Sequence, residues 1–310
     1  MRVLVTGATG FLGHAVVAAL ADAGHQVTAL SRADKNVPAQ VSATTVGDVL
    51  SASDVARAVQ DVQAVCHVAA LARVRDSFVD PAGYWQTNTS GTINVLRALA
   101  DSATATQPKR IVLASTGAVY GTPSKQPTSE DEVTNPGNPY ARSKLAADQA
   151  AADIAATGLV GAVSLRAFNI AGAAAGVADS DETRLIPKVL AVQAGRASEL
   201  VVNGDGSAVR DFVHVEDMAD AFVRALGACS PGQWAAYNVG SGRRTSVRDV
   251  LTAAAEVTGQ PVPVRHQPAA PEPPVMLADS TRIRSDLGWQ APKSDLTRIL
   301  SDAWNALTRG

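Results

Sequence analysis

Cysteine is scarce in this sequence of 310 residues. Only two cysteines are present, Cys66 and Cys229, and they lie far apart in the chain. Cys66 falls in an apolar, strand-like run, where a thiol packs as a small hydrophobic side chain. Two such cysteines do not predict a disulfide framework, so we expect a cytoplasmic protein without disulfides.

The sequence also lacks an excess of charge and any long apolar run. Lysine and arginine total 27 against 29 aspartates and glutamates, which gives a net charge of −2. Nucleic acids and anionic membranes attract basic proteins, so neither is an expected partner. No run approaches the about 18 uninterrupted apolar residues of a membrane-spanning helix. The start shows no basic region followed by an apolar stretch and a cleavage site, so we expect no secretion signal.

Short strand patterns alternate with helical patterns over the first half of the sequence. The periodicity predicts strands at 3–6, 26–30, 64–69, 110–114 and 161–165, and helices at 11–23, 51–59, 81–100 and 140–156. This alternation indicates a parallel sheet covered by helices on both faces. Further on, a strand is expected at 200–202, and the prolines of 262–274 predict an extended segment.

A glycine-rich turn follows the first predicted strand and opens the first predicted helix. Glycines at these points permit a tight turn and let a pyrophosphate approach the backbone. The free amides at the start of the helix then face the phosphates. We therefore predict a dinucleotide-binding turn made by Gly7, Thr9, Gly10, Phe11, Leu12 and Gly13.

These patterns together predict an α/β fold with a doubly wound parallel sheet of the Rossmann type. A smaller C-terminal α/β lobe is expected to hold the substrate. The dinucleotide-binding domain is expected at 1–172, completed by about 207–242, and the substrate lobe at about 173–206 and 243–310.

The end of the second predicted strand distinguishes the two nicotinamide dinucleotides. An acid there accepts hydrogen bonds from the ribose and repels a 2′-phosphate, whereas an arginine attracts that phosphate. The sequence has Ser31-Arg32 and no acid before Asp34. Arg32 therefore favours NADP, and NAD stays open because a solvated loop arginine has the same sequence signature.

Tyr140 and Lys144 lie four residues apart at the start of a predicted helix, so their side chains share one face. A free phenol has a pKa near 10, and a shift to about 7 needs roughly 4 kcal/mol. A neighbouring ammonium and an oxidised nicotinamide ring can supply that stabilisation. Ser115 and Thr116 end an earlier strand, where open α/β sheets bind ligands. We predict that Tyr140 removes a hydroxyl proton, that a hydroxyl at this strand end holds the oxygen, and that Lys144 keeps the phenol acidic and orients the ribose.

The spacing Gly7-x-x-Gly10-x-x-Gly13, followed by Thr116 and the Tyr140/Lys144 pair, resembles the extended short-chain dehydrogenase/reductase family. The resemblance covers nearly the whole chain and is strongest to the epimerase/dehydratase branch, whose members act on nucleotide sugars. It implies a homodimer formed through the helices that start near 81 and 140. Alignment on Val119-Tyr120-Gly121 places Thr116 at the family's catalytic serine or threonine. The resemblance also implies further cofactor contacts at Asp48, Val49, Val68, Ala69, Ala70 and Asn88.

The residues after Thr116 narrow the expected reaction. Nucleotide-sugar 4,6-dehydratases carry Asp-Glu there, and UDP-glucuronate decarboxylases carry glutamate where Ala118 stands. Gly117 and Ala118 have no proton to give. The resemblance therefore implies a nucleotide-sugar 4-epimerase that oxidises C4 and returns hydride to the other face. An NADPH-dependent 4-ketosugar reductase, a sugar dehydrogenase and a non-catalytic NAD(P)-sensing protein stay open as alternatives.

The second half of the chain resembles the same branch in the order of its motifs. By this resemblance Asn169 and Arg210 bind the substrate diphosphate, and Leu185 contacts the substrate. The expected partner is a small molecule, a nucleotide sugar, and no metal is expected.

Two departures leave UDP itself open. Asn203 precedes a Gly-Asp-Gly turn, where members of this branch often carry an aromatic residue that stacks on uracil. Residues 269–272 read Ala-Ala-Pro-Glu in place of a motif that supplies a second phosphate-binding arginine. Arg265 is then the candidate replacement.

Overall fold

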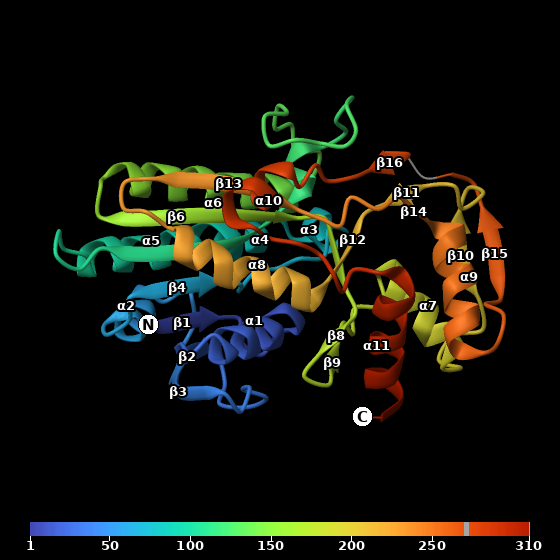
Figure 1. The fold of residues 1–310 in the computed structure, drawn as a ribbon, viewed down its shortest axis with the longest axis horizontal. Helices are drawn as coiled ribbons and strands as arrows, with labels where there is room; N and C mark the ends of the chain where they lie inside the picture. The colour runs from blue at the N-terminus through green and yellow to red at the C-terminus, as the bar shows by residue number, and fades with distance from the viewer. Residues whose placement is uncertain (270–272, 310) are drawn as a thin grey trace.

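The computed structural model describes residues 1–269 and 273–309. Its larger part is a seven-stranded sheet in the order β13-β6-β5-β4-β1-β2-β3, on the left in Figure 1. Every neighbouring pair in this sheet is parallel. The first three strands of the chain extend the sheet from β1 to β3. The later strands, from β4 to β13, extend it on the other side of β1. This reversal between β1 and β4 is the place where open α/β sheets bind ligands, and the predicted Rossmann-type fold is confirmed.

The strands of the large sheet follow the apolar runs of the sequence. They are β1 (Arg2–Thr6), β2 (Gln26–Ser31), β3 (Val41–Val46), β4 (Ala64–His67), β5 (Lys109–Thr116), β6 (Val160–Ala167) and β13 (Trp234–Val239). All eight residues of β6 are buried, as expected for a strand with helices on both faces. The strand predicted at 64–69 ends at His67, which frees the next residues to form a loop at the ligand edge.

Helices cover the two faces of this sheet. One face packs against α1 (Phe11–Asp22) and α8 (Val215–Ala228), which lie in front in Figure 1. The other packs against α2 (Ala52–Val59), α5 (Gly91–Ser102) and α6 (Pro139–Ala156). Both interfaces are apolar, so burial of these side chains is the main stabilising contribution to the fold.

The helix predicted over 81–100 is not one regular helix. The chain forms α3 (Asp76–Val79), α4 (Pro81–Tyr84), a π-helical turn η1 (Trp85–Ser90) and then α5. The side chain of Asn88, in this wider π turn, donates hydrogen bonds to Leu71 in the loop after β4 and to Ser143 on α6. Such turns are frequent at functional sites.

A smaller lobe lies on the right in Figure 1 around its own apolar core. It contains α7 (Leu185–Gln193), β10 (Leu200–Asn203), α9 (Val247–Thr258), β15 (Val264–Gln267) and α11 (Leu296–Arg309). The strand β15 makes part of the predicted 262–274 segment extended, as expected. The division at 172, 206 and 242 stays a prediction, although 212–239 supplies both α8 and β13 to the large sheet.

Short elements join the two parts. They are η2 (Gly117–Tyr120), β7 (Asn169–Ala171), β8 (Ala173–Ala174), β9 (Val177–Ala178), β11 (Val209–Arg210), β12 (Phe212–His214), β14 (Thr245–Ser246), β16 (Val275–Met276) and α10 (Thr281–Leu287). The pairs β7–β12 and β11–β16 are parallel.

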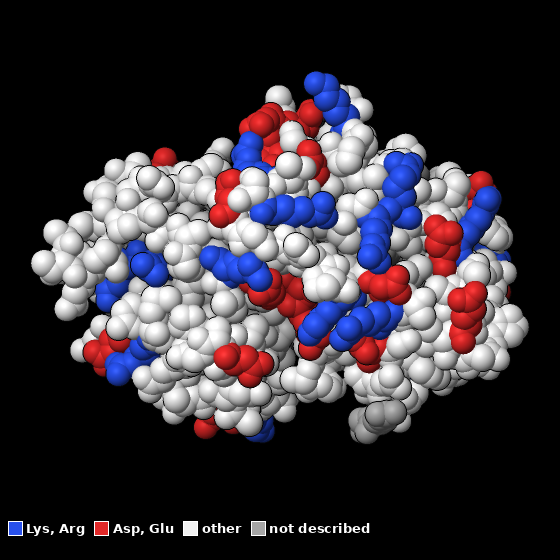
Figure 2. All heavy atoms as spheres, in the orientation of Figure 1, with Lys and Arg blue, Asp and Glu red and all other residues white. Residues whose placement is uncertain are grey.

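Two general features concern the surface. None of the helices in the described ranges is long and apolar enough to cross a membrane. Acidic and basic side chains are interspersed over the face seen in Figure 2, with no broad area of one sign on it.

Candidate active site

The predicted glycine turn and the predicted catalytic hydroxyl lie at the carboxyl edge of the large sheet. Thr6 pairs in register with His67, and His67 with Leu113, so β1, β4 and β5 end side by side. Gly7 follows β1 and Thr116 ends β5. The loop after β1, the loop after β4 and the end of β5 therefore share one edge.

The glycine turn has the geometry that a pyrophosphate needs. Gly7 has φ +72°, and a Cβ there would lie 2.7 Å from the amide nitrogen of Ala69. A Cβ on Gly13 would collide with the carbonyl oxygen of Gly7. No side chain caps α1, whose N-cap is Gly10. A side-chain-free turn with open helix amides fits a dinucleotide phosphate.

The loop after β4 lies directly against this turn. The hydroxyl of Thr6 accepts the amide of Ala69 at 3.3 Å and bonds Nδ1 of His67 at 2.7 Å. Nε2 of His67 bonds the Thr92 hydroxyl at 3.0 Å. Burial, together with the charge of Lys144, lowers the pKa of His67 to about 3. His67 is therefore a neutral buried group that fixes the predicted cofactor loop formed by Val68, Ala69 and Ala70.

The residues expected at the adenosine end also lie together. The Gly47 amide donates to the Ser31 carbonyl at 2.9 Å. This bond brings Asp48 and Val49, which follow β3, next to Ser31 and Arg32 at the end of β2. The side chain of Arg32 is exposed, which leaves it available to a ligand at that edge.

Asn88 is fully buried and already engaged within the protein. Its Nδ2 donates to the carbonyl of Leu71 at 2.9 Å and to the hydroxyl of Ser143 at 3.0 Å. Its Oδ1 accepts the Leu71 amide at 2.8 Å. Asn88 thus ties the loop after β4 to the helix that carries Lys144, and its contact with a cofactor stays a prediction.

Thr116, Tyr140 and Lys144 come together where β5 and α6 meet. Thr116 is buried, and its Oγ1 accepts the amide of Ala118 at 3.1 Å. The Thr116 hydroxyl also lies close enough to the Tyr140 phenol to lower the pKa of that phenol. The Lys144 side chain follows one turn later on α6 and is buried. The structure therefore brings the three predicted catalytic residues together.

The charges around this trio differ from the expectation. Burial raises the pKa of Tyr140, while the hydrogen bond from Thr116 and the charge of Arg184 oppose that rise. Burial also lowers the pKa of the Lys144 ammonium to about 8, opposed by the carboxylate of Asp148. The expected lowering of the Tyr140 pKa therefore needs more positive charge than the chain alone supplies, and an oxidised nicotinamide carries such a charge.

Arg184 is a residue that the sequence analysis missed. Its Nη1 pairs with Oδ2 of Asp179 at 2.8 Å, and its Nε lies 3.6 Å from Oδ2 of Asp181. The same Asp181 oxygen receives Nε of Arg73 at 3.2 Å. These ion pairs join the loop after β4 to the loop before α7, beside Tyr140. The only signal in the sequence was the position of Arg184 directly before Leu185.

The predicted substrate residues lie on the elements that join the two parts. Asn169 is on β7, where its Nδ2 donates to the carbonyl of Asp211 at 2.8 Å. Leu185 is the first residue of α7. Arg210 is on β11, and its Nη1 donates to the carbonyl of Pro273 at 3.0 Å. The carboxylate of Asp211 accepts backbone amides from 241, 242 and 278.

Arg265 is not placed as a second phosphate ligand. Its Nε pairs with Oε1 of Glu199 at 2.5 Å, and the arginine side chain is 56% exposed on β15. This ion pair holds Arg265 at the outer β10–β15 sheet of the lobe. Asn203 accepts Nε2 of Gln267 at 2.6 Å. In the replaced motif at 269–272, residues 270–272 lie outside the described residues.

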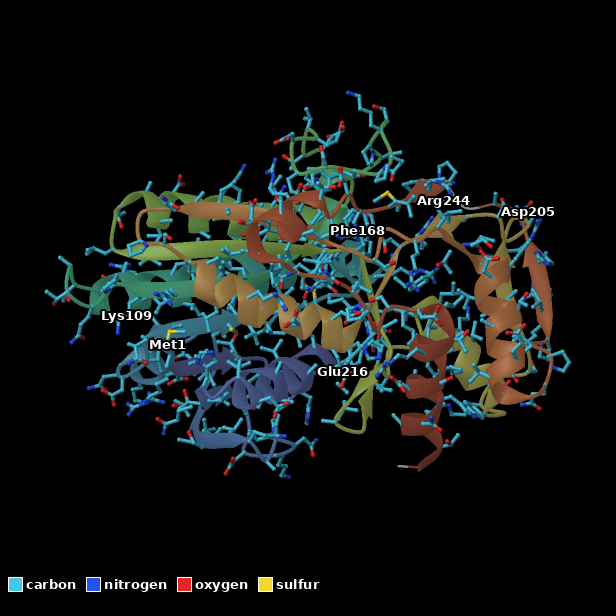
Figure 3. All side chains as sticks on the ribbon, in the orientation of Figure 1. Met1, Lys109, Phe168, Asp205, Glu216 and Arg244 are labelled. Atoms are coloured by element: carbon cyan, nitrogen blue, oxygen red, sulfur yellow. The ribbon has the colours of Figure 1, made fainter. Side chains whose placement is uncertain are left out.

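Phe168 packs against the residue that follows Thr116. A Cβ on Gly117 would lie 2.7 Å from Cε2 of Phe168. Figure 3 labels Phe168 at the junction of the large sheet and the smaller lobe. An acidic side chain at 117 would therefore require Phe168 to move.

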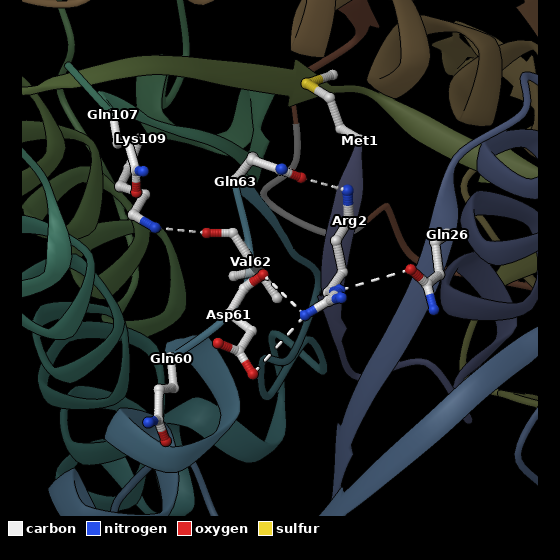
Figure 4. A pocket seen from close by; sticks show the side chains of 9 residues that line it. All are labelled: Met1, Arg2, Gln26, Gln60, Asp61, Val62, Gln63, Gln107 and Lys109. Atoms are coloured by element: carbon white, nitrogen blue, oxygen red, sulfur yellow. Dashed lines mark hydrogen bonds and ion pairs between the residues drawn. The ribbon is translucent and has the colours of Figure 1, made fainter.

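A separate pocket of about 340 Å³ lies at the opposite end of the sheet strands (Figure 4). Its charged groups are engaged with their neighbours. Nη1 of Arg2 lies 3.7 Å from Asp61, and Nζ of Lys109 donates to the carbonyl of Val62 at 2.7 Å. None of the predicted site residues lines this pocket.

A phosphate-type glycine turn, a hydroxyl at the end of β5 and a tyrosine–lysine pair at one edge of a doubly wound sheet define a class of nicotinamide-dependent enzymes. Comparison with known proteins gives the family. Residues 3–240 match the model of the NAD dependent epimerase/dehydratase family, and the chain belongs to this family.

Relatives and solved structures are similar over nearly the whole chain. The UDP-glucose 4-epimerase of Corynebacterium glutamicum is 35% identical, over 98% of this chain and 95% of the relative. The structure of a UDP-glucose-4-epimerase from Stenotrophomonas maltophila, with bound NAD and formylated UDP-arabinopyranose, has a TM-score of 0.91 and 32% identity. It covers 100% of this chain and 99% of that one. The UDP-glucose 4-epimerase from Brucella ovis in complex with NAD has a TM-score of 0.90 and 33% identity, covering 98% and 97%.

Proposed function

We propose that this protein is a nucleotide-sugar 4-epimerase that works with a bound nicotinamide dinucleotide. The observation that supports this proposal is that Thr116, at the end of β5, and the Tyr140/Lys144 pair of α6 lie at the sheet edge that also carries the glycine turn. Relatives named UDP-glucose 4-epimerase that are similar over nearly their full length support it.

In the proposed reaction Tyr140 accepts the proton of the sugar 4-hydroxyl and later returns it. Thr116 donates a hydrogen bond to the same oxygen, and Lys144 orients the ribose and stabilises the phenolate. The dinucleotide, when bound, supplies reversible oxidation at C4 of the sugar. Arg184 adds positive charge beside the phenol, which favours its ionised form.

The packing of Phe168 on Gly117 supports epimerisation over elimination of water. Elimination needs an acid beside the reacting carbon. The first side-chain carbon of any larger residue at 117 would lie 2.7 Å from the Phe168 ring, so that acid would fit only if Phe168 moved, and Gly117 itself supplies no acid. Proton exchange at this site is left to the Tyr140 phenol.

A second candidate is an NADPH-dependent nucleotide-4-ketosugar reductase. The exposed Arg32 at the end of β2 favours it, because an arginine there attracts a 2′-phosphate. The two reactions differ in their need for reductant. An epimerase converts UDP-galactose to UDP-glucose without net change in reduced-nicotinamide absorbance. A reductase leaves UDP-galactose unchanged and depletes added NADPH only when a nucleotide-4-ketosugar is supplied as the hydride acceptor. A non-catalytic NAD(P) sensor would do neither.

For substrate binding we propose that Asn169 and Arg210 hold the diphosphate and that Leu185 contacts the sugar nucleotide. A planar guanidinium is suited to bidentate phosphate contacts. An Arg210→Ala variant is expected to raise KM for a UDP-sugar by at least about tenfold with a smaller change in kcat. An unchanged KM would remove Arg210 from the substrate site.

We also propose a homodimer. Most of the exposed large apolar side chains lie between residues 71 and 93, at Leu71, Val74, Phe78, Val79, Trp85 and Ile93. Exposed apolar side chains that gather on a surface mark interaction sites. Light scattering is expected to give twice the chain mass, and a Trp85→Ser/Ile93→Ser variant is expected to shift it toward the monomer.

A further inference from the structure

A buried ion pair joins α6, the helix that carries Tyr140 and Lys144, to the neighbouring strand β6. Asp148 follows Lys144 by one turn on α6, so both side chains leave the same face. Nε of Arg166, on β6, lies 3.1 Å from Oδ2 of Asp148. The two side chains are 6% and 2% exposed, so this is an interior pair with little solvent screening.

Both partners are fixed by the strands beneath them. The hydroxyl of Ser115, next to Thr116 on β5, donates to the same Asp148 oxygen at 3.0 Å. Nη1 of Arg166 donates to the Tyr120 hydroxyl at 2.9 Å, and its guanidinium stands 5.2 Å from the centre of the Tyr120 ring. The Asp148 carboxylate therefore cannot swing freely toward Lys144.

The other oxygen of Asp148 has no hydrogen-bond donor. Oδ1 is buried and unpartnered among the described residues. Leaving a buried charged acceptor without a donor is costly, so such a group normally has a reason to persist. Asp148 acts on Lys144 through its charge, without a hydrogen bond. The ammonium hydrogens thus remain available on the cofactor side.

The remaining groups facing Lys144 do not take over this role. His67, from β4, is held neutral by burial, so it supplies no negative charge. Tyr140, on the same helix as Lys144, is a neutral phenol until it gives up its proton. Arg166 carries positive charge and lies behind Asp148.

We propose that Asp148 is a positioning residue that keeps Lys144 in its charged form, and that Arg166 and Ser115 hold the carboxylate one turn away so that it does not capture the ammonium. The role in catalysis rests on the proposed function. The effect on the charge of Lys144 does not depend on which sugar the enzyme uses.

The direct test is a titration of Lys144 itself. The protein is labelled with 13C at the lysine ε carbon, and Lys144→Arg assigns the signal. The wild-type pKa is expected at about 8. In Asp148→Asn we expect it to fall by about one unit or more, because the nearby carboxylate favours the charged form. Asp148→Glu is expected to restore most of the shift. A Lys144 signal that titrates alike in wild type and Asp148→Asn overturns the proposal.

A double variant separates charge from folding. Asp148→Asn alone leaves Arg166 as an unpaired buried charge and is expected to lose stability. Asp148→Asn/Arg166→Gln removes both charges, so its stability should be recovered in part while the lowered Lys144 pKa remains. Recovery of the wild-type titration in the double variant would show that the pair is only structural. Asp217→Asn is the matched control, since Asp217 is a buried carboxylate that accepts the Ser294 hydroxyl and lies on α8, which packs on the other face of the sheet from α6.

Kinetics supply the second readout. Turnover needs charged Lys144. In Asp148→Asn the alkaline limb of the pH profile of kcat should therefore move to lower pH, by the same number of pH units as the fall in the Lys144 pKa. If the titration shifts while no sugar nucleotide is turned over, the proposed function fails and the assignment of Asp148 stands. If turnover is normal and the alkaline limb is unmoved, the assignment fails and the proposed function stands.

Discussion

The rings of Tyr84 and Tyr140 meet edge to face, with centres 6.3 Å apart and planes at 87°. Aromatic pairs favour this arrangement, and it adds about 0.5–1.5 kcal/mol beyond the area buried. The hydroxyl of Tyr84 donates to the carbonyl of Arg73 at 2.5 Å. Tyr84 therefore supports both the catalytic phenol and the loop whose Arg73 meets Asp181.

This relationship predicts different outcomes for two substitutions. Tyr84→Phe keeps the ring, so kcat should change little, and loss of the hydrogen bond should cost about 1 kcal/mol of unfolding free energy. Tyr84→Ala opens a cavity beside Tyr140, so it should cost about 3–5 kcal/mol and lower kcat. Urea unfolding and steady-state rates measure both. Equal rates in wild type and Tyr84→Ala would show that the phenol is positioned without Tyr84.

Arg184→Gln should raise the pKa of Tyr140, because the arginine charge opposes the effect of burial. The phenolate is the base, so activity rises with pH through this pKa. The acid limb of the kcat/KM profile is therefore expected to move to higher pH, with the largest rate loss at low pH. Arg196→Gln is the control, since Arg196 pairs with Glu182 of the same loop but, unlike Arg184, is not among the charges that act on Tyr140. If wild type, Arg184→Gln and Arg196→Gln all show the acid limb at the same pH, Arg184 does not favour the ionised form of Tyr140.

Buried neutral His67 predicts a loss of stability in acid. Its pKa is about 3 in the folded chain, against 6.5 for an unperturbed histidine. Between these values the unfolded state binds the additional proton, so its contribution to stability falls as pH drops through this range, by at most about 1.4 kcal/mol per unit. His67→Gln is expected to flatten the pH dependence of the urea midpoint. An unchanged slope would mean that other groups control it.

Arg32 gives a prediction about the dinucleotide. If it contacts a 2′-phosphate, Arg32→Ala should weaken NADP binding by at least about tenfold and leave NAD binding nearly unchanged. Lys35→Ala, another exposed cation of the same loop, is the control. Calorimetry with both dinucleotides measures the effect. If wild type and Arg32→Ala bind NADP with equal affinity, Arg32 does not contact a 2′-phosphate and the reason for expecting NADP over NAD is lost.

Much of the fold was predictable because its signals are local. The strands at 3–6 and 110–114 and the helix from about 140 follow apolar periodicity and lie within the observed elements, give or take a residue. The π turn at 85–90 was not predictable, because it depends on the bonds of Asn88 to Leu71 and Ser143, which are distant in sequence.

The candidate site shows the same contrast. Thr116, Tyr140 and Lys144 were found because their spacing reports one strand end and one helix face. The Asp54 side chain shows the limit of such local signals. Ser51 caps α2 by accepting the Asp54 amide three residues later, whereas the Asp54 carboxylate accepts the amide of Asp48 on the preceding loop.

Arg184, Asp148 and Arg166 were missed for a common reason. Each acts through a partner on another element or across a helical turn inside the packed chain. No sequence spacing marks those contacts.

The central claim is that the Tyr140 phenol, next to a bound nicotinamide, moves the proton during oxidation of a sugar hydroxyl. The most direct measurement compares wild type and Tyr140→Phe, both shown to retain the dinucleotide, for conversion of UDP-galactose to UDP-glucose. Our account predicts conversion by the wild type without net change in reduced nicotinamide, and a loss of at least about a hundredfold in Tyr140→Phe. Turnover by Tyr140→Phe at nearly the wild-type rate would contradict it.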